Sequence, residues 1–88
     1  MPHGKVAVIG EVTRPGLVDY QPGMTLLEAL KAVGGLTPFA DPARAAVLRY
    51  SRGLSATAGI RLDQVIDGRM PDQPLEDGDL LGIPTLGQ

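Results

Sequence analysis

The chain begins with a segment in which apolar and polar side chains alternate, as they do in a strand that buries one face. Three valines share the buried face of this expected strand: Val6, Val8 and Val12. Pro15 and Gly16 then suit the central positions of a type II turn, because proline presets its φ and glycine accepts a positive φ. A second strand is therefore expected at residues 17 to 20, and the two strands form a hairpin.

The segment from residue 25 to residue 34 has the clearest helical pattern. Thr25 and Glu28 match a capping box, in which each side chain accepts a hydrogen bond from a backbone N–H at the helix start. The apolar stripe of this helix comprises Leu26, Leu27, Leu30 and Val33. Gly34 or Gly35 is expected to end the helix in a left-handed conformation. No other segment offers a comparable apolar face, so this helix should lie on the sheet.

The stretch from residue 35 to residue 47 is rich in alanine but contains two prolines. Pro38 and Pro42 bias the residue before each of them away from helical angles. At most, Asp41 caps a single turn over residues 42 to 44, with proline at the first helical position. We therefore expect a link from the helix back to the sheet.

The second half of the chain predicts further strands. Residues 45 to 50 alternate as a strand, and residues 51 to 59 are small and polar enough to be a hairpin turn. Residues 60 to 68 are expected to begin as a strand and to close in a short helical turn at about 62 to 67. One face of this turn combines Leu62, Val65 and Ile66. An Asp-Gly turn then precedes a last strand at residues 80 to 83.

The element order is strand, strand, helix, strand, strand with a short helix, and strand. This order indicates an α+β domain in which one main helix packs on a mixed sheet of about five strands. It is the pattern of the β-grasp fold, the roll of ubiquitin. A chain of 88 residues fits one such domain with one core, so we expect residues 1 to 88 to form a single domain.

The composition argues against several classes of protein. The net charge of −2 is too balanced for a nucleic-acid binder, and the lack of cysteine excludes disulfides, thiolate catalysis and Cys-ligated metal clusters. No run approaches the roughly 18 apolar residues that span a bilayer, and the first residues lack the apolar core of a signal peptide. We therefore expect either a cytosolic protein or a domain cut from a longer chain.

Candidate catalytic chemistry is sparse. His3 is the lone histidine, and one imidazole cannot supply both a base and a ligand set. The acidic run at residues 76 to 79 is better explained as a turn than as a calcium site, which needs a longer alternating series of oxygen ligands. We therefore expect no enzymatic activity, no catalytic residue, no metal and no cofactor.

Four residues are candidates for contact with a partner or ligand. If the strands that carry them are neighbours, Arg49, Arg52 and Arg61 come close together and can grip an anionic sugar or a partner's carboxylates. The alternative is a solvated sheet face on which acidic residues pair with the arginines. Phe39, in the link, either packs beneath the helix end or projects as an anchor for a neighbouring domain or subunit.

Five segments resemble one known family in their order and spacing. They read VIGEVTRPGLV, TLLEALKAVGGLTPFAD, VLRYSRG, RLDQVIDG and PLEDGDLLGIP. Together they resemble the soluble-ligand-binding β-grasp (SLBB) domain of the bacterial polysaccharide export proteins, from about residue 5 to residue 84. Each segment alone is a common turn or cap, and the specificity lies in the five together.

The resemblance implies a periplasmic, outer-membrane-associated module of a capsule or exopolysaccharide exporter. In such proteins these domains stack around a channel formed by a ring of subunits, so the expected partners are copies of the chain or neighbouring domains. The implied role is non-catalytic assembly, with recognition of a glycan or another small ligand as the alternative. The chain carries no export domain and no lipoprotein cysteine, so we expect it to be one domain of a larger protein.

Overall fold

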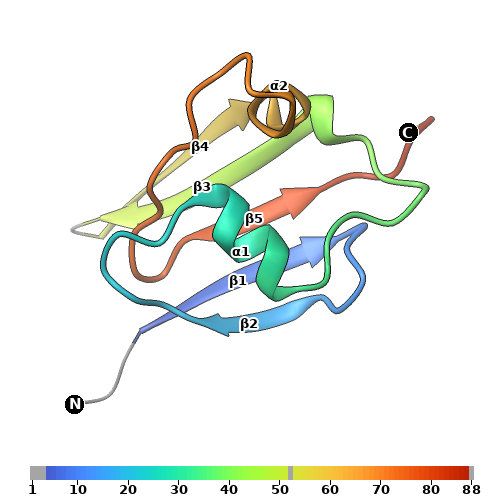
Figure 1. The fold of residues 1–88 in the computed structure, drawn as a ribbon. Helices are drawn as coiled ribbons and strands as arrows, with labels where there is room; N and C mark the ends of the chain where they lie inside the picture. The colour runs from blue at the N-terminus through green and yellow to red at the C-terminus, as the bar shows by residue number, and fades with distance from the viewer. Residues whose placement is uncertain (1–3, 52, 88) are drawn as a thin grey trace.

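A mixed sheet of five strands carries the fold, and the main helix lies across one face of it (Figure 1). The computed structural model describes residues 4 to 51 and 53 to 87. The strands are β1 (Lys5–Gly10), β2 (Gly16–Asp19), β3 (Ala45–Ser51), β4 (Leu54–Ile60) and β5 (Leu80–Ile83). The helices are α1 (Leu26–Ala32), the 3-10 turn η1 (Pro42–Arg44) and α2 (Leu62–Asp67).

The strand order is β2-β1-β5-β3-β4. Strand β5 pairs parallel with β1 and antiparallel with β3, and the two hairpins, β1–β2 and β3–β4, are antiparallel. The last strand of the chain therefore lies at the centre of the sheet. This arrangement confirms the expected α+β fold of the β-grasp type.

The first hairpin is confirmed, but its tight turn is not. Val8 pairs with Gly16, whereas β1 continues to Gly10 beside β5, so residues 11 to 15 form a loop instead of a type II turn at Pro15 and Gly16. The connection is held by the end of α1, because the Arg14 N–H donates to the carbonyl of Val33 at 2.8 Å. These contacts are distant in sequence, and the local turn signal does not contain them.

Gly10 ends β1 with a φ of 94°. A Cβ atom at this position would lie 2.0 Å from the carbonyl oxygen of Ile83, at the end of β5. Only glycine therefore permits the close approach of the two central strands at this point.

Helix α1 begins as its sequence predicts. The Thr25 hydroxyl accepts from the Glu28 N–H at 3.3 Å, and the Glu28 carboxylate accepts from the Thr25 N–H at 3.0 Å. The next two N–H groups donate to a distant segment, Leu26 to the carbonyl of Gln73 and Leu27 to the carboxylate of Asp72. The helix start is thus fully hydrogen-bonded, and it anchors the chain that follows α2.

The segment predicted as a hairpin turn, residues 51 to 59, forms most of a strand instead. Strand β4 pairs with β3 along its whole length, from Ser51 opposite Leu54 to Ala45 opposite Ile60. The residues between Leu54 and Ile60 are small, and the strand is exposed up to Gly59. An edge strand that buries little of either face shows no apolar alternation, so the pattern could not reveal it.

Helix α2 occupies the predicted residues and ends at Gly68, whose φ is 81°. Leu62 and Val65 are buried as expected. Ile66 is 45% exposed, so its placement on the buried face was wrong. The helix has six residues, and its narrow buried stripe does not extend to this side chain.

The link from α1 to β3 contains a single turn, η1, as predicted. Asp41 precedes this turn but makes no side-chain capping bond. Its N–H donates instead to the carbonyl of Pro84 at 2.8 Å, and Ala40 forms a bridge with Thr85. The link is therefore fastened to the segment that leaves β5.

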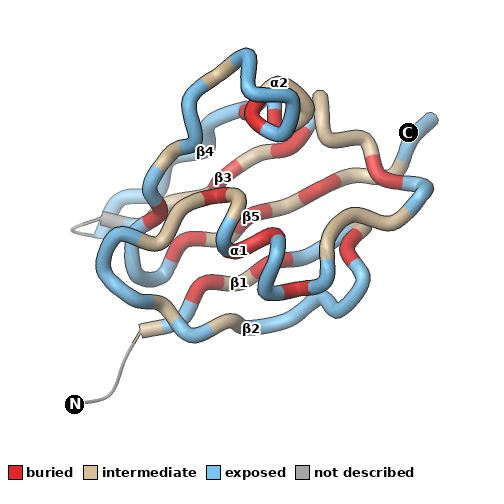
Figure 2. The backbone as a smooth tube through the Cα atoms, viewed as in Figure 1, coloured by how far each residue is buried: buried red, intermediate tan, exposed pale blue. Residues whose placement is uncertain are grey.

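The core lies between the sheet and its two helices (Figure 2). Its buried members are Val6, Val8, Val12, Leu26, Ala29, Leu30, Val33, Ala40, Ala45, Val47, Ile60, Leu62, Val65, Leu75, Leu81 and Ile83. The three valines expected on the first strand belong to it, although Val12 lies beyond the end of β1. Of the predicted stripe of α1, Leu26, Leu30 and Val33 belong to it, and Leu27 is only partly buried against it. In the described part of the chain, no helix is long and apolar enough to cross a membrane.

Candidate functional site

Arg49 lies on β3 and is engaged by two carboxylates. Its Nε donates to Asp79 Oδ1 at 3.0 Å and its Nη2 to Asp79 Oδ2 at 2.8 Å, a bidentate pair. Its Nη1 lies 3.3 Å from Glu76 Oε2. The hydrogen bond to Asp79 raises the pKa of Arg49 above its ordinary value, and burial opposes this effect. The guanidinium is therefore held by the protein's own acids.

Asp79 is the buried charge at this position, and its side chain is fully shielded from water. Besides the two bonds from Arg49, its Oδ2 accepts the Glu76 N–H at 2.8 Å. A buried carboxylate needs such partners, since an unpaired one is costly. The sequence indicated only a turn at residues 76 to 79. The missing signal was the antiparallel β3–β5 register, which places Leu48 opposite Leu80 and so Arg49 beside Asp79.

Arg61 lies at the other end of β4 and does not join Arg49. Because Arg49 pairs with Ala56 and Ile60 lies opposite Ala45, the two arginines are about five residue steps, or about 16 Å, apart along the strands. The expected arginine cluster is therefore wrong for these two residues, because the register sends them to opposite ends of the hairpin. Arg52 falls outside the described residues.

The partner of Arg61 is Asp63, at the start of α2. Arg61 Nε donates to Asp63 Oδ1 at 3.0 Å and its Nη2 to Oδ2 at 2.8 Å. This hydrogen-bonded pair holds the pKa of Asp63 below its ordinary value and raises that of Arg61. Both groups are accessible to water, so the contact orients the side chains more than it stabilises the fold.

Phe39 is 66% exposed, so the interpretation that it packs beneath the helix end is wrong. Its carbonyl accepts the N–H of Leu86, which is also exposed, at 2.8 Å. The Phe39 N–H donates to the Thr37 hydroxyl at 3.2 Å, and the next residue, Ala40, is buried and bridged to Thr85, so the backbone is held on both sides of Phe39. The aromatic ring is therefore exposed on a backbone that hydrogen bonds hold in place. Its role as an anchor stays a prediction.

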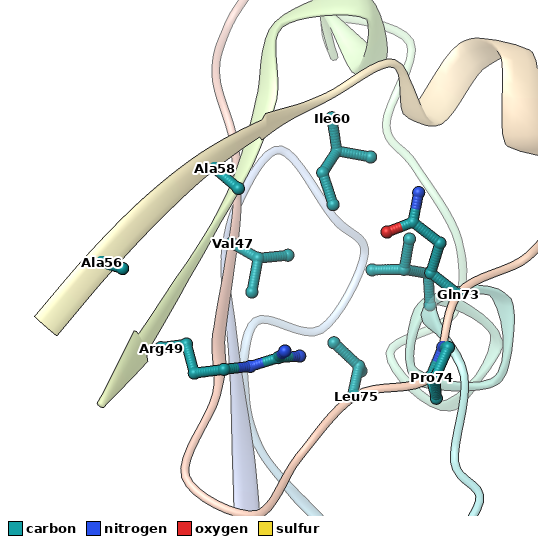
Figure 3. Close-up of a pocket in the computed structure, with 9 residues that line it drawn as sticks. Val47, Arg49, Ala56, Ala58, Ile60, Gln73, Pro74 and Leu75 are labelled. Atoms are coloured by element: carbon teal, nitrogen blue, oxygen red, sulfur yellow. The ribbon is translucent and has the colours of Figure 1, made fainter. Parts of the chain in front are cut away.

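A cavity of about 190 Å³ lies between the β3–β4 hairpin and the segment that leads into β5 (Figure 3). Its lining is Leu26, Val47, Arg49, Ala56, Ala58, Ile60, Gln73, Pro74 and Leu75. The cavity exists because the small side chains of Ala56 and Ala58 do not fill the space beneath the opposite wall. Figure 3 shows Gln73 reaching inward from that wall and the guanidinium of Arg49 extending toward Leu75.

The described residues do not bring three histidine, cysteine, aspartate or glutamate side chains together in a group that could hold a metal ion. His3 lies outside the described part of the chain. The polar groups of the cavity are one arginine that is already paired and one amide. The arrangement suits contact with a small neutral or weakly polar group.

The pairing of Arg49 with buried Asp79 predicts unequal effects of two matched substitutions. Arg49→Met should lower the free energy of unfolding by about 2 kcal/mol, because it leaves a buried carboxylate without its counter-charge. Arg61→Met removes the exposed partner of Asp63 and should change stability little. Urea unfolding of both variants measures the difference. Equal losses would contradict a structural role that is specific to Arg49.

Comparison with known protein families finds one match, to the SLBB domain, over residues 5–70. The match spans β1 to α2 and ends before β5, so the resemblance noted at residues 74 to 84 lies beyond it. SLBB domains are found in polysaccharide export proteins, and the match indicates a module related to polysaccharide binding or export. A comparison with curated proteins finds no match. Since the SLBB match covers most of the sequence, the chain belongs to the SLBB domain family.

Proposed function

We propose that this chain is a non-catalytic assembly domain of a bacterial polysaccharide export protein that works in the periplasm at the outer membrane. The observation that carries the proposal is the SLBB match, because SLBB domains of export proteins are typically periplasmic. The polymer handled is a capsule or another exopolysaccharide. The chain would act as one domain of a longer protein.

The surface permits an assembly role. Large apolar side chains are exposed at Ile9, Leu17, Phe39, Tyr50, Leu54, Ile66 and Leu86. They come from strands β1 to β4, from the α1–β3 link, from α2 and from the segment after β5, so they are dispersed over the surface. Dispersed exposed apolar side chains are common on domains of any function, so they permit contact with neighbouring domains but single out no one surface. The proposed partners are copies of the chain or adjacent domains in a ring-shaped export complex.

The charged side chains favour a structural role over a catalytic one. Arg49 and Arg61 each form a bidentate pair with an aspartate of the same chain. A catalytic or anion-binding site directs such groups at a substrate position instead. The Arg49–Asp79 pair fastens β3 to the turn before β5, whereas the Arg61–Asp63 contact is local and exposed.

Ligand binding is a second candidate, and the cavity beside Arg49 is the observation that favours it. Its polar and apolar lining could receive a small ligand or one unit of a glycan. Its volume of about 190 Å³ is below the roughly 300 Å³ at which small-molecule sites usually begin. The assembly role is therefore the better supported of the two.

The assembly proposal predicts that a charge at Phe39 disrupts export but not folding. In the bacterium that encodes the chain, Phe39→Asp should lower exported polymer by more than about tenfold, since a central aromatic anchor contributes about 2 kcal/mol to an interface. Polymer is measured at the cell surface, with the protein level as the reference. Gln21→Asp is the matched control, because it adds the same charge at an exposed polar position outside this set of apolar residues, and it should leave export unchanged.

Deletion of the whole domain separates the function from the choice of anchor. Export should fail in the deletion strain, as it does in the Phe39→Asp strain. Normal export without the domain would contradict the assembly role. Failure of the deletion strain together with normal export in the Phe39→Asp strain would place the partner surface elsewhere.

The cavity gives a test that distinguishes the two functions. The assembly role predicts no saturable shift of the Ala56 and Ala58 amide resonances when oligosaccharide fragments of the exported polymer are added at millimolar concentration. Ala58→Leu fills the cavity and serves as the control. Saturable shifts that Ala58→Leu abolishes would establish ligand binding instead.

A further inference from the structure

The two edges of the sheet differ in how far they are protected against pairing with another strand. Strand β2 is four residues long, ends in Asp19 and lies between two prolines, Pro15 and Pro22. Strand β4 is seven residues long and carries no charge and no proline. Charges, prolines and short length are the usual devices that block edge-to-edge association. The β2 edge has these devices and the β4 edge lacks them.

The sequence of β4 is also symmetric about its central residue. It reads L-S-A-T-A-G-I, so that a large aliphatic residue, a small residue and an alanine precede Thr57, and the same types follow in reverse order. An antiparallel strand pair related by a twofold axis places residue i opposite residue j and residue j opposite residue i. A sequence with this symmetry pairs with itself without placing unlike side chains opposite each other.

We propose that two copies of this chain associate through antiparallel pairing of their β4 strands, with the twofold axis at Thr57. The five-stranded sheets of the two copies then join into one continuous sheet. Every residue of the added pair is uncharged, so no like charges are opposed and no ion is desolvated. The interface uses backbone hydrogen bonds that the exposed edge of β4 leaves available.

The side chains of the two faces match in this register. On the face toward α1, Leu54 of one copy lies opposite Ile60 of the other, and Ala56 lies opposite Ala58. Leu54 is 74% exposed in the single chain, while Ile60 lines the cavity described above. Pairing therefore brings an exposed leucine to the open rim of the other copy's cavity and covers it.

On the opposite face, Thr57 of one copy meets Thr57 of the other, a cross-strand pair that favours association. Ser55 lies opposite Gly59, where small residues leave room for the approach of the two sheets. The polar face of one strand thus meets the polar face of the other. The same register therefore places like side chains opposite each other on both faces of the paired strands. A shift of one residue would destroy this match.

The inference goes beyond the proposed export role and does not depend on it. A twofold contact joins two copies only, so it is additional to any contact that closes a ring. A single strand pair buries less surface than the roughly 1,200 Å² of a stable interface. We therefore expect reversible association that rises with protein concentration.

Sedimentation of the 88-residue chain over micromolar to millimolar concentration measures this association directly. The native chain should shift from the mass of one copy to that of two. Thr57→Lys and Thr57→Glu each place like charges opposite each other and should stay monomeric, while an equimolar mixture of the two should form a heterodimer. Leu17→Lys adds a matched charge on the β2 edge and should leave the association unchanged. Circular dichroism melts verify that each variant folds.

Three results would overturn the proposal. The first is a native chain that stays monomeric at millimolar concentration. The second is a Thr57→Lys variant that associates as the native chain does, and the third is a Thr57→Lys and Thr57→Glu mixture that remains monomeric although both variants are folded.

A cysteine pair tests the register independently, and the native chain has no cysteine to interfere. In the proposed register the Cα atoms of the two Thr57 residues lie about 4.5 to 5.5 Å apart, a separation that a disulfide can bridge. The two Ser55 residues lie about 13 Å apart, out of reach. Mild oxidation should therefore cross-link Thr57→Cys and leave Ser55→Cys monomeric. Cross-linking of Ser55→Cys at the same rate would contradict the register.

Discussion

The fold depends on the insertion of β5 between two hairpins that do not otherwise pair. Within the sheet of the described residues, the β1–β2 hairpin and the β3–β4 hairpin are joined only through this four-residue strand, which pairs with β1 on one side and with β3 on the other. Leu81 forms the centre of the junction, opposite Val8 and Val47, and all three side chains are buried. Removal of this contact would leave two hairpins, and isolated hairpins are at best marginally stable.

The turn before β5 fixes the position of the strand. The carbonyl of Asp79 accepts the Ala7 N–H at 2.9 Å, while its carboxylate accepts two hydrogen bonds from Arg49 Nε and Nη2. One residue thus contacts both hairpins. The same placement has two further consequences: the chain that leads into β5 becomes the wall of the cavity, and β4 is left at the outer edge of the sheet. The candidate ligand site and the candidate pairing surface both follow from where β5 lies.

The sequence correctly predicted the elements that depend on residues close together in the chain. The capping box of Thr25 and Glu28, the single turn at Pro42 and the last strand were all visible in the sequence, because each rests on neighbouring residues. The errors came from contacts between distant residues. Strand β4 was missed because an exposed edge strand needs no apolar alternation, and the arginines were placed together because the register of β3 and β4 was unknown. The turn at residues 76 to 79 was predicted, but the pairing of Asp79 with Arg49 was not, because the two residues are 30 positions apart in the sequence.

Native-state hydrogen exchange at residue resolution tests the dependence on β5 most directly. If β5 joins the two halves, the amides of Leu81 and Ile83 exchange only when the whole chain unfolds, with a free energy equal to that of global unfolding. The amides of the β1–β2 hairpin should then never be better protected than those of β5. Exchange of Leu81 at a lower free energy than Val6 and Val8 would mean that β5 detaches from a sheet that stays folded, and it would contradict this account.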